Sequence, residues 1–220
     1  MRLIQRPSPN HDERTAPVDM LVLHYTGMAS GQGALDRLCD PAAKVSAHYT
    51  IDEDGTVYAQ VPEARRAWHA GLSHWAGVDN VNARSIGIEL VNPGHEYGYR
   101  AFPQAQIAAL IELSRDILAR HAIAPSRVLG HSDVAPARKD DPGELFPWQK
   151  LADEGIGLWP QAIASDLDAD ALTRYGYDPN APLDKVITAF QRHFRPRKLD
   201  GKWDAECAGL LASLLNKIGT

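Results

Sequence analysis

The chain contains 220 residues, 44% of them hydrophobic and 23% charged, and its formal net charge is −5. This length and composition suit a globular protein with one domain of ordinary size and a small second one. The negative charge argues against general affinity for nucleic acid, which needs a basic patch or stripe, and no apolar run in the sequence is long enough to span a membrane.

The N-terminal stretch does not read as a secretory signal, because Leu3 and Ile4 are followed at once by polar residues and a proline. A signal needs an apolar stretch of about 7–15 residues. We therefore expect a cytoplasmic protein, with the periplasm as the alternative if the chain lacks its signal segment. Because disulfides are uncommon in the cytoplasm, Cys39 and Cys207 are expected to be unpaired, buried thiols. A monomer is also expected.

The first third of the chain predicts several strands. The run from Val18 to Tyr25 is almost continuously apolar, which indicates a buried strand, and a helix is expected around residues 34–38. Two β-prone runs then flank Asp54-Gly55, a dipeptide typical of a tight hairpin. Residues 63–84 are rich in Gly, Asn, Trp and His, and we expect them to form a loop.

The segment after residue 84 alternates as a strand does, with Ile86, Ile88 and Leu90 on one face. Pro103 begins a predicted helix with one apolar stripe. Its members recur at intervals of three and four residues: Ile107, Leu110, Ile111, Ser114, Ile117 and Leu118. A short strand over residues 127–130 and a loop over residues 132–149 are expected to follow.

Beyond about residue 160 the pattern becomes helical, which predicts two domains, residues 1–160 and 161–220. Helices are expected over residues 162–172, 183–194 and 204–217. They should form a small three-helix bundle around a shared apolar core: Leu183, Val186, Phe190, Leu210, Leu211 and Leu214.

Two histidines and one aspartate stand out as candidate metal ligands. His24 ends an apolar strand, His131 follows another, and Asp141 lies ten residues later in a proline-bearing loop. Two imidazoles and one carboxylate are a typical catalytic zinc site, which keeps its fourth position open for water. A lone histidine at a strand end is more often structural, and a lone aspartate before proline is usually a turn residue, so the surrounding motifs must decide.

Five segments in the first 150 residues together resemble the type-2 family of zinc N-acetylmuramoyl-L-alanine amidases, which is related to the peptidoglycan recognition proteins: LVLHYTG, SAHYTIDEDG, AWHAG, SIGIELVN and GHSDVAPARKDDPG. The resemblance implies an α/β fold with a central mixed β-sheet flanked by helices. It also implies that His24, His131 and Asp141 bind Zn²⁺, and that the reaction releases stem peptide from muramic acid.

The same resemblance places three further residues in the site. Glu89 matches the family's catalytic glutamate, and Lys139 matches a lysine that stabilises the oxyanion. Arg138 matches a position that contacts substrate, where a guanidinium suits carboxylates. His48 and His69 also lie in motif segments, and we expect them to line the groove or to support the ligands instead of binding metal.

The tail resembles a three-helix peptidoglycan-binding module through its AFQRHF and DGKWD segments. Expected partners are muropeptide fragments, with intact peptidoglycan as the alternative. The chain departs from the recycling branch of the family at Tyr25, Asp52 and Glu53, which favours a wider substrate range. A peptidoglycan-binding protein without catalysis is the main competing reading, and a zinc peptidase that cuts stem-peptide bonds is a third.

Overall fold

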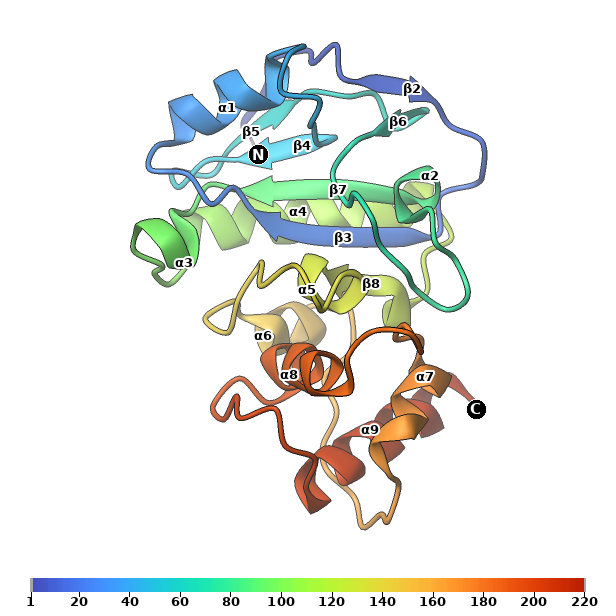
Figure 1. Ribbon diagram of the computed structural model, residues 1–220. Coiled ribbons are helices and arrows are strands. Elements are labelled where there is room, and N and C mark those ends of the chain that lie inside the picture. The colour runs from blue at the N-terminus through green and yellow to red at the C-terminus, as the bar shows by residue number, and fades with distance from the viewer. Residues whose placement is uncertain (1, 220) are drawn as a thin grey trace.

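The computed structural model describes residues 2–219, and its centre is a six-stranded mixed sheet (Figure 1). The strand order is β1 (Arg2–Gln5), β5 (Thr56–Ala59), β4 (Tyr49–Ile51), β7 (Ser85–Leu90), β3 (Met20–Tyr25) and β8 (Val128–Gly130). From β4 to β8 all neighbours are parallel, whereas β5 runs antiparallel to β4 in the expected hairpin. Two short strands, β2 (His11–Glu13) and β6 (Arg65–Ala67), form a separate antiparallel pair.

The central strands β3 and β7 are covered on both faces, and the alternation of their side chains divides the molecule. Leu21 and Leu23 of β3 join the alternating isoleucines of β7 in one core. Met20 and Val22 of β3 belong to a second core on the opposite face. His24 continues the Met20–Val22 face, because side chains two residues apart in a strand point the same way.

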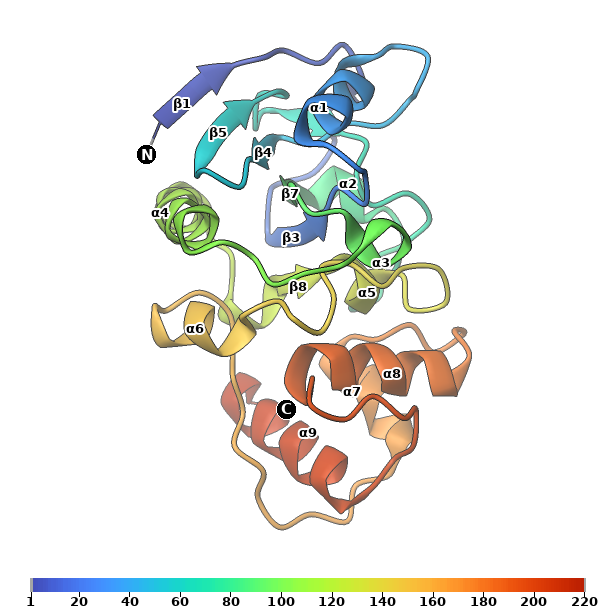
Figure 2. The same cartoon turned by 90° about the vertical axis from the view of Figure 1, so that its left-hand side faces the viewer.

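Helix α4 (Gln104–Arg120) covers the first of these faces (Figure 2). Its predicted stripe is confirmed from Ile107 to Ile117, and Leu118 at the end of the stripe is partly buried. The remaining helices of the first 134 residues lie on the other side of the sheet: α1 (Gly31–Cys39), α2 (Val81–Arg84), α3 (Gly94–Tyr97) and α5 (His131–Val134). Helices α2, α3 and α5 are each a single turn. None of them was predicted, and α2 and most of α5 lie in segments that were expected to be loops.

Residues 161–219 contain three α-helices, but the first is shorter and later than expected. Helices α8 (Leu183–Phe194) and α9 (Ala205–Ile218) confirm the predictions for residues 183–194 and 204–217. Between residues 162 and 172 only a 3₁₀ turn forms, Ala169–Ala171, and it leads into α7 (Leu172–Tyr175). The prediction was wrong because Ile163 lies against α9, where its backbone nitrogen donates to the Gly209 carbonyl at 3.2 Å.

The tail packs directly against the body of the protein below β8 (Figure 1). Phe190 and Leu211, predicted core residues of the bundle, are fully buried, whereas Leu183 is 46% exposed and was wrongly placed in that core. The apolar cluster of the tail is continuous with Met20 and Val22 of the sheet. The described part of the tail therefore shares a core with the face of the sheet that carries His24.

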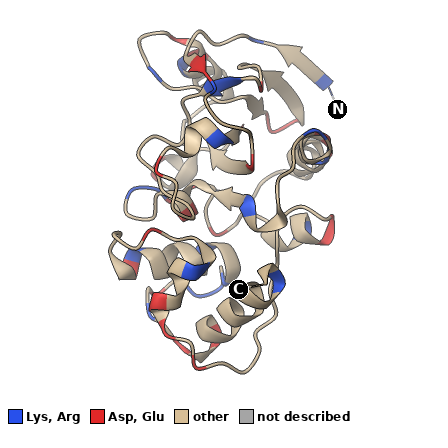
Figure 3. Cartoon of the chain, turned by 90° about the vertical axis from the view of Figure 1, so that its right-hand side faces the viewer, with Lys and Arg blue, Asp and Glu red and all other residues tan. Residues whose placement is uncertain are grey.

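Several smaller features complete the chain. Helix α6 (Trp148–Asp153) and a 3₁₀ turn, Pro125–Arg127, connect the sheet to the tail. Cys39 and Cys207 are both unpaired, as expected, but Cys39 is only partly buried. No helix within residues 2–219 is long and apolar enough to cross a membrane. In the view of Figure 3, acidic and basic residues are interspersed along the elements.

Candidate metal centre and active site

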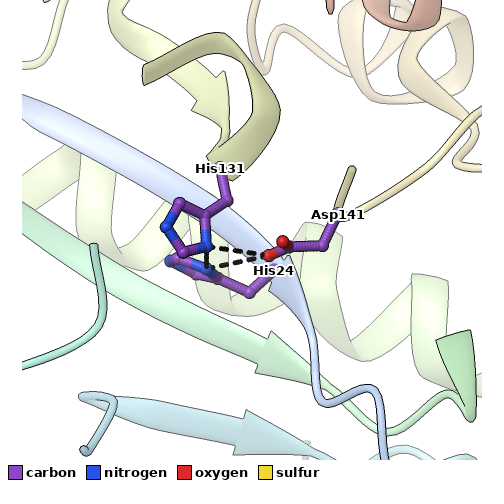
Figure 4. Close-up of side chains that lie close together, drawn as sticks. All are labelled: His24, His131 and Asp141. Carbon is purple, nitrogen blue, oxygen red and sulfur yellow. Dashed lines mark hydrogen bonds and ion pairs between the residues drawn. The ribbon is translucent and has the colours of Figure 1, made fainter. Parts of the chain in front are cut away.

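Three side chains from separate elements converge at the carboxyl end of β3 (Figure 4). His24 ends the strand, His131 begins α5, and Asp141 lies in the loop that follows. Nδ1 of His24 is 2.9 Å from Nδ1 of His131, and both nitrogens are 3.1 Å from Oδ2 of Asp141. All three residues are buried. The structure thus brings together the three residues that the sequence proposed as metal ligands.

The hydrogen bond at the far side of the His131 ring fixes its tautomer. Nε2 of His131 lies 3.0 Å from the carbonyl oxygen of Ala70. A carbonyl oxygen can only accept, so Nε2 must carry the hydrogen and donate it. In the neutral imidazole Nδ1 is then an acceptor, and its lone pair points toward His24 and Asp141.

A longer chain of hydrogen bonds assigns the His24 tautomer in the same way. The Ser85 hydroxyl donates to the Val81 carbonyl at 2.7 Å, so its oxygen accepts from Nε2 of His69 at 3.0 Å. Nδ1 of His69 is consequently an acceptor, and Nε2 of His24, 3.0 Å away, donates to it. Nδ1 of His24 is left with a free lone pair, which faces that of His131.

This arrangement fits a bound cation. Two unprotonated nitrogens 2.9 Å apart repel each other unless positive charge lies between them. Burial, and then the proximity of His131, lowers the pKa of His24 to about 4, so this ring is neutral near pH 7. The pKa of Asp141 is lowered by both imidazoles despite its burial. Two neutral imidazoles held by outer hydrogen bonds and one carboxylate are a donor set that suits zinc.

Gly87 explains how His69 can reach this position. Gly87 lies on the same face of β7 as Ser85, and the His69 ring packs directly over it. A Cβ atom at position 87 would lie 2.4 Å from Cγ of His69, which is too close for any side chain. The glycine of the SIGIEL segment therefore provides space for the ring that orients His24.

An open pocket of about 390 Å³ lies beside the three ligands. Its wall includes all the sequence-predicted catalytic and substrate residues, Glu89, Lys139 and Arg138, together with His69 and Trp68. We call it the central pocket. A substrate that enters it meets the candidate metal ligands and these side chains at once.

Glu89 reaches the central pocket from β7, opposite the face that packs against α4. In the parallel register, Glu89 lies directly beside His24. Its Oε2 atom is buried without a hydrogen-bond partner among the described residues. Burial, and then the charge of Asp141, raises the pKa of Glu89 well above its usual value, and Lys139 partly opposes this. A carboxyl group in this state is suited to accept and return a proton.

Arg138 has a structural contact as well as a place in the pocket wall. Its Nη2 donates to the carbonyls of Ala70 and Leu72, at 2.8 and 2.6 Å. Ala70 is also the acceptor for His131. Arg138 therefore holds the segment that orients one candidate ligand while its guanidinium lines the pocket.

His48 and His69, expected to line the groove or support the ligands, have different surroundings. His69 contacts His24 directly, whereas His48 accepts from the Gly87 backbone nitrogen at 2.9 Å and contacts Arg14. Arg14 itself donates to five backbone carbonyls and so joins the segments around β6 and β7: those of Glu63, Arg65, Asn82, Ala83 and Ser85. His48 thus supports the strand beneath His69.

Sequence reasoning missed two residues of this site, Ser85 and His95. Ser85 could have been found, because the alternation that places Glu89 in the pocket also places Ser85 on the same face. His95 lies in α3 and lines the pocket, where its Nδ1 is 2.9 Å from the Tyr25 hydroxyl. No spacing or motif in the sequence distinguished it from the other histidines.

Comparison with known proteins identifies the family. The family model of N-acetylmuramoyl-L-alanine amidases matches residues 14–144, which contain every candidate site residue. The chain belongs to the N-acetylmuramoyl-L-alanine amidase family. It is therefore a hydrolase of the amide bond for which the family is named.

Members of this amidase family resemble the chain over most of its length. AmiD of Escherichia coli is 40% identical over 92% of this chain and 84% of its own. A structure of AmiD with the substrate anhydro-N-acetylmuramic acid-L-Ala-D-gamma-Glu-L-Lys has a TM-score of 0.81, covering 94% of this chain and 93% of that one. AmpDh3 of Pseudomonas aeruginosa has a TM-score of 0.84 at 34% identity, covering 98% and 96%.

A shorter amidase matches only part of the chain. The 1,6-anhydro-N-acetylmuramyl-L-alanine amidase AmpD of Haemophilus influenzae is 34% identical over 66% of this chain and 88% of its own. Of the three positions at which this chain departs from the recycling branch, only Tyr25 lines the central pocket. Glu53 instead pairs with Arg100 at 2.6 Å, and Asp52 accepts from the Glu53 backbone nitrogen.

Proposed function

We propose that this amidase binds one zinc ion through His24, His131 and Asp141 and cleaves the bond between muramic acid and L-alanine in peptidoglycan fragments. The observation that carries the proposal is the convergence of two imidazole lone pairs and one carboxylate oxygen on one point beside the central pocket. The outer hydrogen bonds of both histidines hold the lone pairs in that direction.

A zinc ion held there would act as a Lewis acid and would lower the pKa of water at its open position. The protein supplies the proton transfers. Glu89 faces the pocket with an unpartnered oxygen and a raised pKa. It takes a proton from the attacking water and returns it to the leaving amide nitrogen, as a general base and then a general acid.

Two cations in the pocket wall suit the charges of the substrate and of the reaction. Lys139 places an ammonium group near Glu89 and offsets the negative charge that develops on the amide oxygen during attack. Arg138 binds carboxylates of the stem peptide, while its contacts with Ala70 and Leu72 keep the guanidinium in place.

Fragments are favoured as substrates by the relatives. AmiD was solved with an anhydro-muramyl tripeptide and AmpDh3 with an anhydromuramic pentapeptide. Incubating the enzyme separately with anhydro-muropeptides and with intact sacculi, and identifying the products by mass, would establish its range. Release of free stem peptide from fragments is expected. Cleavage within the stem peptide would instead support the zinc peptidase.

The metal is tested by removal and return. Dialysis against a chelator should abolish turnover, and about one equivalent of Zn²⁺ per chain should restore it. The variant His131→Ala should bind metal far more weakly, whereas His11→Ala, which removes a histidine outside the pocket, should bind it normally. A protein that binds fragments but shows no metal-dependent turnover would favour the non-catalytic binding function and would overturn this proposal.

We also propose the division into a catalytic domain, residues 1–160, and a helical domain, residues 161–220. Two observations support it. The family model ends at residue 144, and AmpD matches only 66% of this chain while using 88% of its own length.

A further inference from the structure

The end of helix α8 in the tail touches the loop that carries two of the three candidate ligands. We call residues 131–144 the ligand loop, because it begins at His131 and contains Asp141. Arg192 of α8 places Nη2 2.8 Å from Oδ1 of Asp140, and its Nε is 3.8 Å from Oε2 of Glu144. These two acidic residues lie on either side of Asp141. The guanidinium therefore pairs closely with Asp140, next to Asp141, and lies within ion-pair distance of Glu144 without a hydrogen bond from Nε to any described residue.

The next residue of α8 contacts the other end of the same loop. Nδ1 of His193 donates to Oδ2 of Asp133 at 2.7 Å. The same carboxylate oxygen accepts from the backbone nitrogen of Gly130 at 2.7 Å, at the turn where His131 begins α5. Tyr177, also in the tail, donates to the other oxygen of Asp133 at 2.8 Å. His193 and Tyr177 of the tail thus donate hydrogen bonds to the Asp133 carboxylate, which also accepts from the backbone at the turn before His131.

The contact between His193 and Asp133 is buried, whereas Arg192 reaches from a mostly buried position to Asp140 at the surface. The side chains of His193 and Asp133 are 3% and 1% exposed, and that of Arg192 is 10% exposed. The His193 ring is stacked between Trp148 and Phe194, with ring centroids at 3.7 and 3.9 Å. Displacement of the loop would separate the buried His193 and Asp133, and a buried polar group that loses its partner is costly.

We propose that helix α8 positions the ligand loop, with Arg192 fixing the segment around Asp141 and His193 fixing the turn at His131. Arg192 and His193 act through other residues and do not touch substrate, so they are positioning residues. The tail then contributes to metal affinity and turnover, apart from any binding of glycan. This inference rests on the proposed zinc amidase function.

A purely structural role for the tail makes a different prediction. If α8 only covers apolar surface, loss of Arg192 lowers stability but leaves the metal affinity of the folded protein unchanged. If α8 positions the ligands, metal affinity falls even in protein that remains folded. Metal affinity measured by competition between Co²⁺ and a coloured chelator separates these two cases without relying on activity.

The test uses the full-length protein, four single variants and one double variant. Arg192→Ala removes the ion pair with Asp140, Arg192→Lys keeps the charge, and Asp140→Asn removes one acceptor from the loop side. Arg197→Ala is the matched control, because it deletes an arginine of the same tail that is 70% exposed and pairs with Glu206. Folding is checked by circular dichroism and by the melting temperature.

We expect Arg192→Ala to weaken metal binding about tenfold, in the range seen when partners outside the ligand shell are lost. Its kcat should fall while KM changes little. Arg192→Lys should recover part of the loss, and Asp140→Asn should reproduce much of it. The double variant of Arg192 and Asp140 should lose less than the sum of the single effects, because both remove one contact.

The control Arg197→Ala should match the parent protein in every measurement. Folded Arg192→Ala and Asp140→Asn proteins with the parent's metal affinity and kcat would overturn the inference. If Arg192→Ala does not fold, Asp140→Asn decides alone, since its side chain is 60% exposed. A parent protein that binds no Co²⁺ or Zn²⁺ would instead contradict the proposed function.

Discussion

The direction of each imidazole lone pair depends on residues that never touch the proposed ion. Ser85 donates to a carbonyl, which makes its oxygen an acceptor for His69, and His69 in turn makes His24 a donor at Nε2. The ligand positions could be predicted from sequence because they lie in recognisable motifs. The tautomers could not, because they depend on carbonyl groups brought near only by the fold.

Glu89 is the residue for which sequence and structure agree most directly. Strand alternation placed it opposite Ile86, Ile88 and Leu90, and the structure confirms that it faces the central pocket. Its raised pKa could not be predicted, because it depends on the burial of the side chain and on Asp141 nearby.

Replacing Glu89 by Gln or Ala should lower kcat by about a hundredfold or more, since general acid–base catalysis contributes about 10²–10⁴-fold. The variants should keep metal and fold, which metal analysis and circular dichroism would verify. Glu13→Gln, an exposed carboxyl in β2, is the control with the same chemical change. Near-normal turnover by Glu89→Ala would mean that another group moves the proton.

Replacing Arg138 by Ala should mainly raise KM, by about tenfold, because a contact present before and during the reaction is removed. The same change removes the hydrogen bonds to Ala70 and Leu72, so a smaller fall in kcat is also expected. Steady-state kinetics on an anhydro-muropeptide separates the two effects. An unchanged KM would show that the guanidinium holds the loop and does not bind substrate.

At the scale of elements, periodic patterns were predicted well and short or contact-dependent elements were not. The α4 stripe and the β7 alternation extend over enough residues to be recognised in the sequence. Edge strands β1 and β2 were not expected, since their side chains are mostly exposed or partly buried and show little apolar pattern. The helix expected over residues 162–172 is replaced by a segment that lies close to Gly209 of α9.

Gly87→Ala tests how strand β7 and His69 fit together. The added Cβ would lie 2.4 Å from the His69 ring, so the ring must move away from His24. Overpacking of this kind costs about 1–3 kcal/mol of stability, and loss of the outer hydrogen bond should weaken metal binding about tenfold. Melting temperature and Co²⁺ competition would measure the two effects.

The variant His69→Ala supplies the control for this prediction. Once the ring is absent, adding Gly87→Ala should have little further effect on metal affinity, because both changes act on one contact. Additive losses in the double variant would show that Gly87 affects the site by another route, such as the Gly87 nitrogen that donates to His48.

At the scale of the whole molecule, two regions that look separate in sequence share one apolar cluster. The tail residues Phe190 and Leu211 join Met20 and Val22 of β3 in this cluster. Composition could reveal the change to helical pattern near residue 160. It could not reveal the shared core, because apolar residues such as Met20 and Val22 would be expected in the interior of the first domain whether or not the tail packs on them.

A chain that ends at residue 161 tests the proposed division. The core between α4 and the sheet contains none of the described tail residues, so the shortened chain should fold and keep zinc and some activity on small fragments. It should be less stable by about 3 kcal/mol or more, since it exposes apolar side chains such as Met20 and Val22, and each fully buried one contributes about 1.5–3 kcal/mol. Chemical denaturation with the circular dichroism signal as readout measures this difference.

The shortened chain also lacks Arg192 and His193, so its metal affinity should fall at least as far as that of the full-length Arg192→Ala protein. Stability and metal affinity, measured together, show whether the tail only covers apolar surface or also positions the ligand loop. Lower stability with unchanged metal affinity would mean that the tail only covers apolar surface of the sheet. Complete unfolding would mean that residues 161–220 belong to the core of the catalytic domain, and the boundary at residue 160 would then mark a change of secondary structure within one folding unit.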